Sequence, residues 1–244
     1  MTADGQPHAD PVEEGRRIIS LAAARGIEVK LFGGVAVAIT CQAASHPALR
    51  RAYKDVDLAT TREHKRPLGE FLAAVGYQPA REFNALHGRT RLLYDDPVNG
   101  RPLDVIVDQF AMCHSMDLRR RLRLPGSTLP TADLLLMKLQ VVETNERDLQ
   151  DAVALLLESD LDGGRVADVL AADWGWWRTA TETLGKVEGY AASFPDQDLA
   201  AGTAKEIGRL RSRVEQAPKG LRWRTRAKIG DRARWYELPE EASD

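Results

Sequence analysis

The sequence predicts an α/β (α+β) fold, in which a small mixed β-sheet with flanking helices is followed by a helical C-terminal domain. Short β-patterned runs alternate with helical segments over the first half of the chain, and two of these runs flank the turn-forming residues "DDPVNG". From about residue 129 the apolar residues recur at i, i+3 and i+4, as on a helix face. We therefore predict four parts: a disordered N-terminus (1–10), an α/β domain (11–128), a helical domain (129–218) and a basic, Trp-containing tail (219–244).

The first elements are predicted to be a helix, a strand and a second helix. "DPVEEGRRIISLAAARG" has Pro11 early, acidic residues in its first turn and apolar residues at helical spacing, and it ends at Gly26. "IEVKLFGGVAVAITCQAA" is typical of a short strand, a glycine pair and a small-residue helix that starts near Val35.

The next elements are predicted to be a strand, a helix and a β-hairpin. A polar loop leads into a strand within "KDVDLATT", and "REHKRPLGEFLAAVGYQ" favours a helix that ends at Gly76. "RTRLLYDDPVNGRPLDVIVDQF" has two β-patterned runs around its turn, which places Asp104 on the second hairpin strand.

The remaining chain is predicted to be helical almost to its end. Thr131 is a candidate N-cap, and further helices are expected in "DGGRVADVLAADWGWWRTATETLGKVEGY" and "DLAAGTAKEIGRLRSRVEQAPKG". In the tail, basic residues alternate with Trp223 and flank Trp235. Such a pattern suits a nucleic-acid backbone, but it is also typical of a solvated face whose tryptophans anchor the tail to the helical domain. "DWGWWRTA" is interpreted as core.

Composition restricts the class of protein. The 244 residues are 43% hydrophobic and carry a net charge of −2, which predicts a soluble globular protein and excludes a general polyanion binder, although a local basic patch remains open. Cys41 and Cys113 lack metal-site or disulfide spacing and favour buried thiols in a reducing compartment. Without a leader-like start or a run of about 20 apolar residues, we expect a cytoplasmic protein with no membrane partner.

Two carboxylates one residue apart, Asp55 and Asp57, are the most informative feature of the sequence. Side chains two apart on a strand share a face, so both would form one anionic spot, and Asp104 could join them from a neighbouring strand. Converging carboxylates on apolar strands call for a cation, and Mg²⁺ prefers such oxygen ligands. The alternatives are that Asp55 and Asp57 are exposed at a strand end, paired with neighbouring basic residues, and that Asp104 lies on an edge strand.

Two Mg²⁺ ions held by such aspartates serve phosphoryl and nucleotidyl transfer, which predicts a phosphate-binding turn nearby. Gly33 and Gly34 lie between a predicted strand and a predicted helix, where backbone N–H groups can approach phosphate closely. A glycine pair alone is a weak signal, and its combination with the later Asp-x-Asp is stronger.

The order of these motifs resembles the nucleotidyltransferase superfamily with a polymerase-β-like palm. The glycine pair precedes "DVDL" and "LDVI", "RAYKDVDLAT" is similar to the corresponding segment of AbiEii-like and minimal bacterial nucleotidyltransferases, and "TADLLLMKLQVVETNERDLQDAVALL" resembles their Lys-containing helical stretch. The resemblance covers about residues 28–158. It implies a nucleotidyltransferase palm and an enzyme that uses two Mg²⁺ ions and an NTP.

The resemblance also implies roles for individual residues. Asp55, Asp57 and Asp104 would be the catalytic and metal-binding residues, and Asp104 would also be the base toward the acceptor hydroxyl. Gly33, Gly34 and Lys138 would bind the nucleotide, with supporting roles for Asp148, Asp151 and Arg51. The sequence departs from the family pattern at Val35, where many members have serine, and in the long separation from Gly34 to Asp55, which is 55 minus 34, or 21 positions.

The predicted function is Mg²⁺-dependent transfer of an NMP from an NTP to a hydroxyl. RNA or tRNA, a protein and a small molecule all remain open as acceptors, and the AbiEii likeness adds a toxin role with a partner antitoxin protein. One alternative is a non-catalytic nucleotide- or RNA-binding module on the same fold, and another is nucleic-acid binding through residues 219–235. Lys138 could instead extend from a buried helix toward solvent, and Asp148 and Asp151 could form surface pairs with Arg147.

Overall fold

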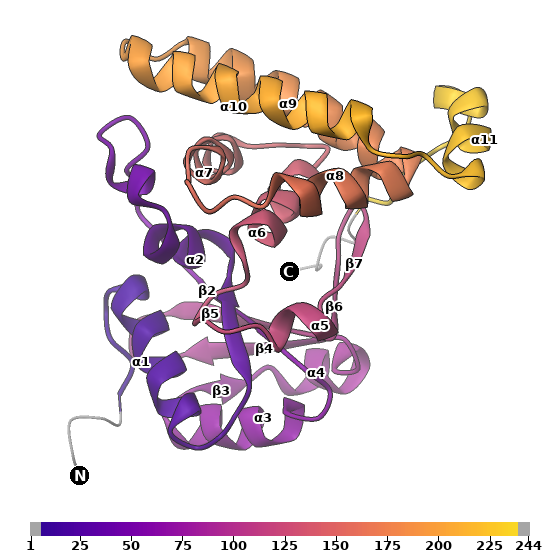
Figure 1. Cartoon of the computed structure of the whole chain (residues 1–244). Helices are drawn as coiled ribbons and strands as arrows, with labels where there is room; N and C mark the ends of the chain where they lie inside the picture. Colours follow the sequence, from indigo (N-terminus) through magenta and orange to yellow (C-terminus); the bar gives the residue numbers. More distant parts are fainter. Residues whose placement is uncertain (1–5, 239–244) are drawn as a thin grey trace. The chain divides into compact units, whose positions relative to one another are not determined.

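The computed structural model describes residues 6–238 and divides into two compact units (Figure 1). Unit 1 comprises the described residues of Met1–Thr40, Arg51–Phe110 and Met116–Pro130, and unit 2 comprises those of Cys41–Arg50, Ala111–Ser115 and Thr131–Asp244. The predicted domain boundary lies after residue 128. Two short segments before it nevertheless belong with the helical unit, where Ala43 N donates to Glu158 Oε1 and His114 N donates to Gln140 Oε1.

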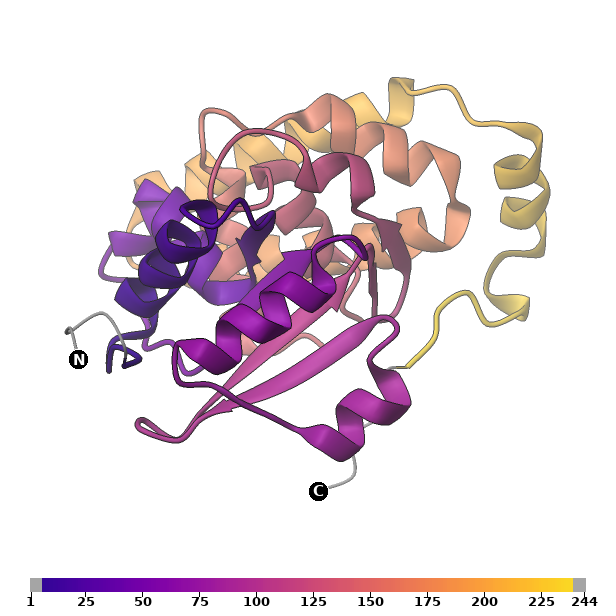
Figure 2. The ribbon, with the colours of Figure 1, turned by 90° about the horizontal axis from the view of Figure 1, so that it is seen from below.

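Unit 1 contains a five-stranded mixed sheet, as the sequence predicts. The strand order is β1-β2-β5-β4-β3, with β2 and β5 parallel and the other neighbours antiparallel. The strands are β1 Val29–Phe32, β2 Val56–Thr60, β3 Gln78–Pro79, β4 Arg91–Asp96 and β5 Arg101–Val107. The predicted hairpin is the β4–β5 pair, whose turn projects at one end of the sheet (Figure 2). A separate short hairpin pairs β6 Gln109–Ala111 with β7 Ser115–Asp117.

One face of the sheet is the apolar core of unit 1. Leu31, Leu58 and Val105 are register neighbours on this face and are fully buried. Two helices cover it, α1 Pro11–Ala23 and α3 Lys65–Ala74: a Cβ added at Gly15 of α1 would crowd Leu31, and one at Gly69 of α3 would lie 2.9 Å from the Tyr94 hydroxyl. Because side chains alternate along a strand, the next residue of each strand points to the opposite face.

The helices of unit 1 begin and end largely where the sequence predicts. Asp10 caps α1 by accepting hydrogen bonds from two backbone N–H groups, and Gly26 has a positive φ of 66° just beyond its end. α2 Gly33–Thr40 starts two residues earlier than expected. Two short helices, α4 Arg81–His87 and α5 Arg119–Leu122, were not predicted.

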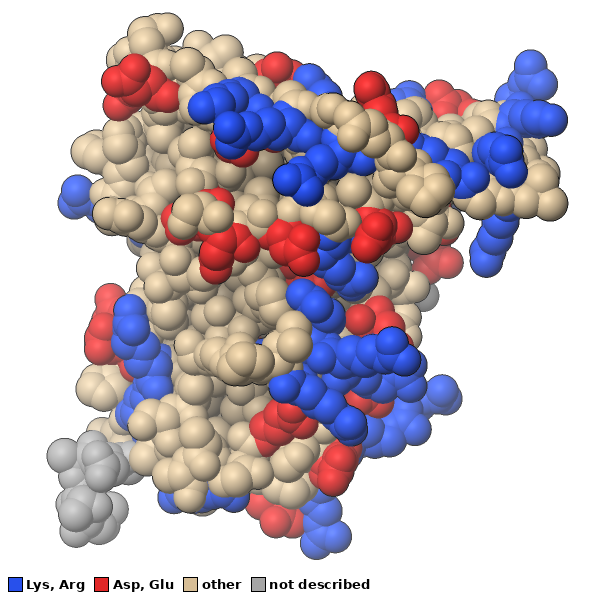
Figure 3. Space-filling view, in the orientation of Figure 1, with Lys and Arg blue, Asp and Glu red and all other residues tan. Residues whose placement is uncertain are grey.

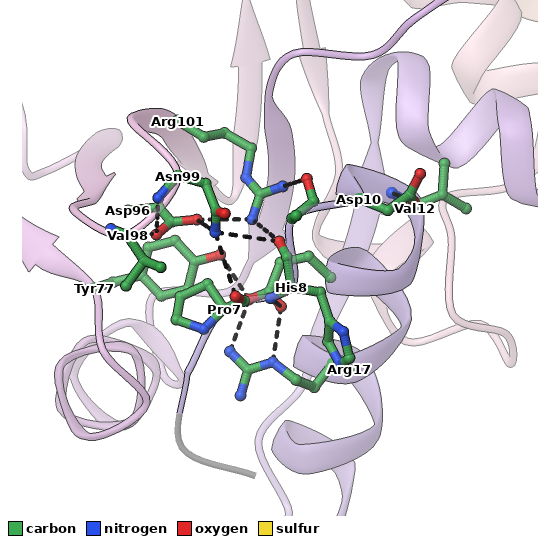
Figure 4. Close-up of polar contacts among 12 residues, drawn as sticks. Pro7, His8, Asp10, Val12, Arg17, Tyr77, Asp96, Val98, Asn99 and Arg101 are labelled. Carbon is green, nitrogen blue, oxygen red and sulfur yellow. Dashed lines mark hydrogen bonds and ion pairs between the residues drawn. The ribbon is translucent and has the colours of Figure 1, made fainter. Parts of the chain in front are cut away.

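A buried polar network holds the first described residues against the sheet (Figure 4). Glu14 accepts hydrogen bonds from His8 N and the Tyr77 hydroxyl at 2.8 and 2.7 Å, and Arg101 donates to the carbonyl oxygens of His8 and Ala9. Residues 6–10 therefore do not match the predicted disordered N-terminus, because distant side chains satisfy their backbone groups; residues 1–5 lie outside the described part of the chain.

Unit 2 is helical, as predicted. Its α-helices are α6 Thr131–Leu139, α7 Glu146–Leu156, α8 Gly163–Ala172, α9 Trp174–Ala192, α10 Gln197–Gln216 and α11 Leu221–Ile229, with 3₁₀ turns η2 Gln42–Ser45 and η3 Gly230–Arg232. Thr131 is the first residue of α6 and its hydroxyl donates to Asp160 at 3.0 Å, so the expected N-cap role is replaced by a tertiary contact. Asn145 and Asp148 form a capping box at the start of α7. Within residues 6–238 the structure contains no helix that is both long and apolar enough to span a membrane.

Candidate functional site

Strands β2 and β5 bring Asp57 and Asp104 side by side. The two residues are direct register partners in the parallel pair, and Phe32 of β1 and Leu93 of β4 extend the same row across the sheet. In-register residues of neighbouring strands share a face, so both carboxylates lie on the face opposite the apolar core. The shared face predicted for these two residues is confirmed. β5 is an inner strand of the sheet, so the edge-strand interpretation of Asp104 is wrong.

Asp55 lies outside the strand that was expected to carry it. β2 begins at Val56, so strand alternation does not direct the Asp55 side chain to the face of Asp57. Asp55 is exposed, and its charge raises the pKa of Asp104. Pairing with β5 begins at Val56–Leu103, so Asp55 lies outside the paired region of β2.

Arg91 supplies positive charge to this pair and was not identified from the sequence. Its Nε donates to both oxygens of Asp104 at 3.0 and 2.9 Å, and its Nη2 lies 2.7 Å from Oδ2. Arg91 is opposite Ile106 on β4, so it reaches Asp104 diagonally across the strand pair. Only the β4–β5 register reveals this contact, because the two residues are 13 positions apart in the sequence.

The electrostatics of Asp104 reflect its burial and its two neighbours. Burial is the largest influence and raises its pKa, Arg91 opposes this by hydrogen bonding and charge, and Asp55 raises the pKa further, so the net direction is upward. The pKa of Arg91 is raised, chiefly by its hydrogen bonds to Asp104 and also by the charge of Asp57. One guanidinium therefore interacts with both carboxylates of the strand pair.

Gly33 lies directly beneath the carboxylate of Asp57. Its φ is +66°, and a Cβ added there would overlap Asp57 Oδ2, so any larger residue would both strain the backbone and displace the carboxylate. The space beside Gly34 is filled by Arg51, whose guanidinium lies 4.4 Å from the centre of the Tyr53 ring, and by Tyr53 itself. The structure thus brings the predicted residues Gly33 and Asp57 together, and Gly34 and Arg51 together.

The other predicted site residues form a cluster in unit 2. Lys138 Nζ lies 3.0 Å from Asp148 Oδ1 and 2.9 Å from Asp151 Oδ2, and all three side chains are largely buried. Burial, the largest single influence, lowers the pKa of Lys138, but the two carboxylates together raise it above its ordinary value. The cluster is not a set of surface pairs, and the Lys138 ammonium does not extend to solvent.

The carboxylates of unit 1 are chemically suited to a hard divalent cation. Asp57 and Asp104 offer oxygen ligands on one face, and the glycine beneath Asp57 leaves its carboxylate room. Within residues 6–238, no three or more His, Cys, Asp or Glu side chains are grouped closely enough to hold a metal ion. The donor types therefore fit Mg²⁺, with two in-register ligands on the sheet and with Arg91 as a competing cation on Asp104.

The tryptophans of the tail pack within unit 2. Trp223 contacts the Trp177 ring at 5.4 Å and donates to Leu170 O, and Trp235 contacts Trp174 at 6.0 Å and donates to Thr179. These contacts favour the anchoring interpretation. They weaken the nucleic-acid hypothesis for residues 219–235, because that hypothesis needs the tryptophan rings to stack on bases. The core interpretation is confirmed for Trp174 and Trp176, each of which is 5% exposed.

Comparison with known proteins gives little independent guidance. No family model matches the sequence, and no curated protein matches it. Among solved structures, the chain is similar to a protein of H. pylori that is provisionally named a nucleotidyltransferase, with 13% identity and a TM-score of 0.44 over 86% of this chain and 97% of that chain. At that identity and TM-score the similarity supports no assignment of activity.

Proposed function

We propose that this chain is a Mg²⁺-dependent nucleotidyltransferase that moves an NMP from an NTP to a hydroxyl acceptor and releases pyrophosphate. The observation that carries the proposal is the register pairing of Asp57 with Asp104 on one face of β2 and β5, above Gly33. Two carboxylates facing away from an apolar core raise each other's energy, and a cation offsets that cost.

The chain's own residues have distinct roles in this proposal. Asp57 and Asp104 would hold the metal, and Asp55, in the loop before β2, would act on Asp104 through its charge because it does not form a group of three ligands with them. When bound, Mg²⁺ screens the charge of the triphosphate and stabilises the leaving pyrophosphate. The acceptor oxygen forms a bond to the α-phosphorus, the bond to the β-phosphate oxygen breaks, and Asp104 accepts the hydroxyl proton.

The finer predictions extend this proposal. The use of two ions, nucleotide contacts from Gly34 and Lys138, supporting roles for Asp148, Asp151 and Arg51, a cytoplasmic location, and an AbiEii-like toxin function with an antitoxin partner all remain proposals. Lys138 also has a structural role, because its charge lies close to the two largely buried carboxylates of Asp148 and Asp151.

Transfer of label from each α-³²P-labelled NTP in Mg²⁺ tests the proposal, with total RNA, cell protein or aminoglycosides as acceptors. We expect the Asp57→Asn/Asp104→Asn variant to lose at least about 100-fold in rate. The matched control is Asp95→Asn, which removes one exposed carboxylate from β4 and should transfer label as the wild type does. Label transfer that persists in the double variant would refute the mechanism, whereas NTP binding without transfer to any acceptor would favour the non-catalytic nucleotide-binding module.

A further inference from the structure

Arginine side chains from three chain segments converge at the C-terminal end of β5. Asp108, the residue after this strand end, organises the segments: its N–H donates to Thr60 O of β2, its carbonyl oxygen accepts from Leu118 N before α5, and its carboxylate accepts from Arg62 N at 2.9 Å. Asp108 has a positive φ of 64°, a conformation that non-glycine residues rarely adopt. The tertiary contacts hold this strained residue in place, and with it the junction of three segments.

This junction brings together an arginine surface, which we define as Arg62, Arg89, Arg119, Arg120 and Arg123. Arg62 lies 3.7 Å from Asp108 and the charge of Asp108 also acts on Arg119, while Arg120 acts on Asp117. Val107 N donates to Thr90 O, which places the preceding residue, Arg89, beside the end of β5 on the β4 side. Lys and Arg side chains gather over the region of α5 in Figure 3.

Arg62 of the arginine surface pairs with Asp108 and Arg119 pairs with Asp117, whereas the other three arginines have no such partner among the described residues. Arg89, Arg120 and Arg123 are exposed, and none of the three makes a hydrogen bond or an ion pair with another described residue. Residues 118–130 contain four arginines and no acidic residue, although the whole chain has a net charge of −2. A local cluster of guanidinium groups on a nearly neutral protein is suited to a polyanion, because each planar fork can bind two phosphate oxygens.

The position of the arginine surface relates it to the carboxylate pair. Both lie on unit 1, along the same two neighbouring strands, and Asp104 precedes Asp108 by four residues on β5 and its end. At about 3.3 Å per residue this separation is about 13 Å, which corresponds to about four stacked nucleotides at 3.4 Å each. A phosphate chain held at the arginines could therefore extend to the carboxylates.

We propose that the arginine surface binds the phosphodiester backbone of a nucleic-acid strand whose terminal hydroxyl is the acceptor. The binding part stands alone, and the acceptor part rests on the proposed nucleotidyl transfer. A nucleic acid is favoured over an acidic protein or an anionic lipid surface because the cations are all arginines, form a compact cluster from three segments, and lie beside a site whose carboxylates suit phosphate chemistry. Binding through the backbone would depend on the phosphate charge of the strand and little on its base sequence.

Anisotropy of fluorescein-labelled 12-nucleotide RNA and DNA strands of one sequence, measured with the full chain across a salt series, tests this proposal. The Arg89→Gln/Arg120→Gln/Arg123→Gln variant removes three exposed cations that make no hydrogen bond or ion pair with another described residue, and it should keep its fold, which circular dichroism checks. We expect it to weaken binding at least 10-fold at low salt and to reduce the slope of log K against log salt by about 2, from about 0.7 per phosphate contact for single strands.

Two matched variants remove the same charge elsewhere. Arg16→Gln/Arg66→Gln/Arg81→Gln changes three exposed arginines on α1, α3 and α4, and Arg222→Gln/Arg224→Gln/Lys228→Gln changes three exposed cations of α11. Wild-type-like affinity in both control variants would support the proposal. Equal loss of affinity in the first control would show only general charge attraction, and loss in the α11 variant alone would place the interface on the tail; either result overturns the proposal.

Tight binding of the wild type to anionic phosphatidylserine vesicles or to an acidic peptide, without binding to either strand, would also overturn it.

Transfer assays separate this proposal from the proposed function. If the arginine variant loses strand binding while wild type binds strands but transfers no label, the surface is correct and the nucleotidyl transfer is wrong. If wild type transfers label to a small molecule and binds neither strand, the nucleotidyl transfer holds and the arginine surface does not bind nucleic acid.

Discussion

At the scale of single residues, the charge balance at Asp104 explains the site better than the acidic residues alone. From the sequence, three aspartates predict a bound metal ion as their counter-charge. The structure adds Arg91, which pairs with Asp104 through two nitrogens and also interacts electrostatically with Asp57. Arg91 and the proposed Mg²⁺ are therefore alternative cations for the same carboxylate, so we expect the site to be sensitive to changes on β4 as well as on β2 and β5.

Gly33 gives the first prediction, because Gly26 provides a control with the same φ of +66° and nothing within 4 Å of an added Cβ. Gly26→Ala should cost about 1–2 kcal/mol in free energy of unfolding from backbone strain alone. Gly33→Ala should cost about 1–3 kcal/mol more, since its methyl group must displace the Asp57 carboxylate. Chemical denaturation of both variants measures the difference. Equal losses would mean that the carboxylate does not lie against Gly33.

Arg91 gives the second prediction, which follows from the proposed metal site. Arg91→Met removes the cation that competes for Asp104, so Mn²⁺ or Mg²⁺ should bind about 10-fold more tightly in calorimetric titration. Arg66→Met, which removes an exposed pair with Glu70, is the control and should leave the dissociation constant unchanged. Weaker metal binding in the Arg91 variant would show that the guanidinium supports the metal site instead of competing with it.

At the scale of elements, local patterns predicted most of the framework and missed what depends on register and distant contacts. Pro11 and Gly26 marked the limits of α1, and the Asp-Pro-Val-Asn-Gly turn identified the β4–β5 hairpin. Asp55 was misassigned because the start of β2 depends on pairing with β5, which no local pattern shows. For the same reason neither Arg91 nor the junction at Asp108, whose backbone hydrogen bonds to Thr60 and Leu118, was predicted.

His114, beside helix α9, gives a prediction on pH dependence. Its Nε2 lies 2.9 Å from the Thr179 hydroxyl and its ring packs on Trp176, while burial, only partly opposed by the charge of Asp173, lowers its pKa below the ordinary value of 6.5. The unfolded chain thus binds a proton more readily than the folded chain, so stability present at neutral pH is lost as pH falls below about 6.5 and through the lower folded pKa.

Replacing His114 should remove that part of the pH dependence. His114→Gln keeps a group that can hydrogen bond to Thr179 but does not titrate, so its free energy of unfolding should fall less than that of wild type between pH 7 and about pH 5. Denaturant titrations at several pH values measure both slopes. His87→Gln is the control because His87 is exposed, and it should follow the wild type. A His114 variant with an unchanged slope would contradict the buried neutral imidazole.

At the scale of the whole molecule, the chain separates a β-sheet unit that carries the carboxylate pair from a helical unit with its own buried charges. The sheet has one largely apolar face, with Leu31, Leu58 and Val105, and an opposite face that carries Asp57 and Asp104. In the helical unit, Lys138 already has two carboxylate partners within 3.0 Å. The proposed cation site therefore belongs to the sheet unit, because Lys138 is the cation of the buried carboxylates in the helical unit.

Hydrogen exchange with and without Mg²⁺, at matched ionic strength, should report this difference between the units. A cation that binds only the folded site stabilises it by about 2.7 kcal/mol at 100 times its dissociation constant, so amides of β2 and β5 should exchange more slowly. Amides of α8 and α10 should be unchanged, and Asp57→Asn should remove the effect on the strands. Protection that spreads equally over both units, or that survives in the Asp57 variant, would place the metal elsewhere and remove the physical basis for the proposed transferase.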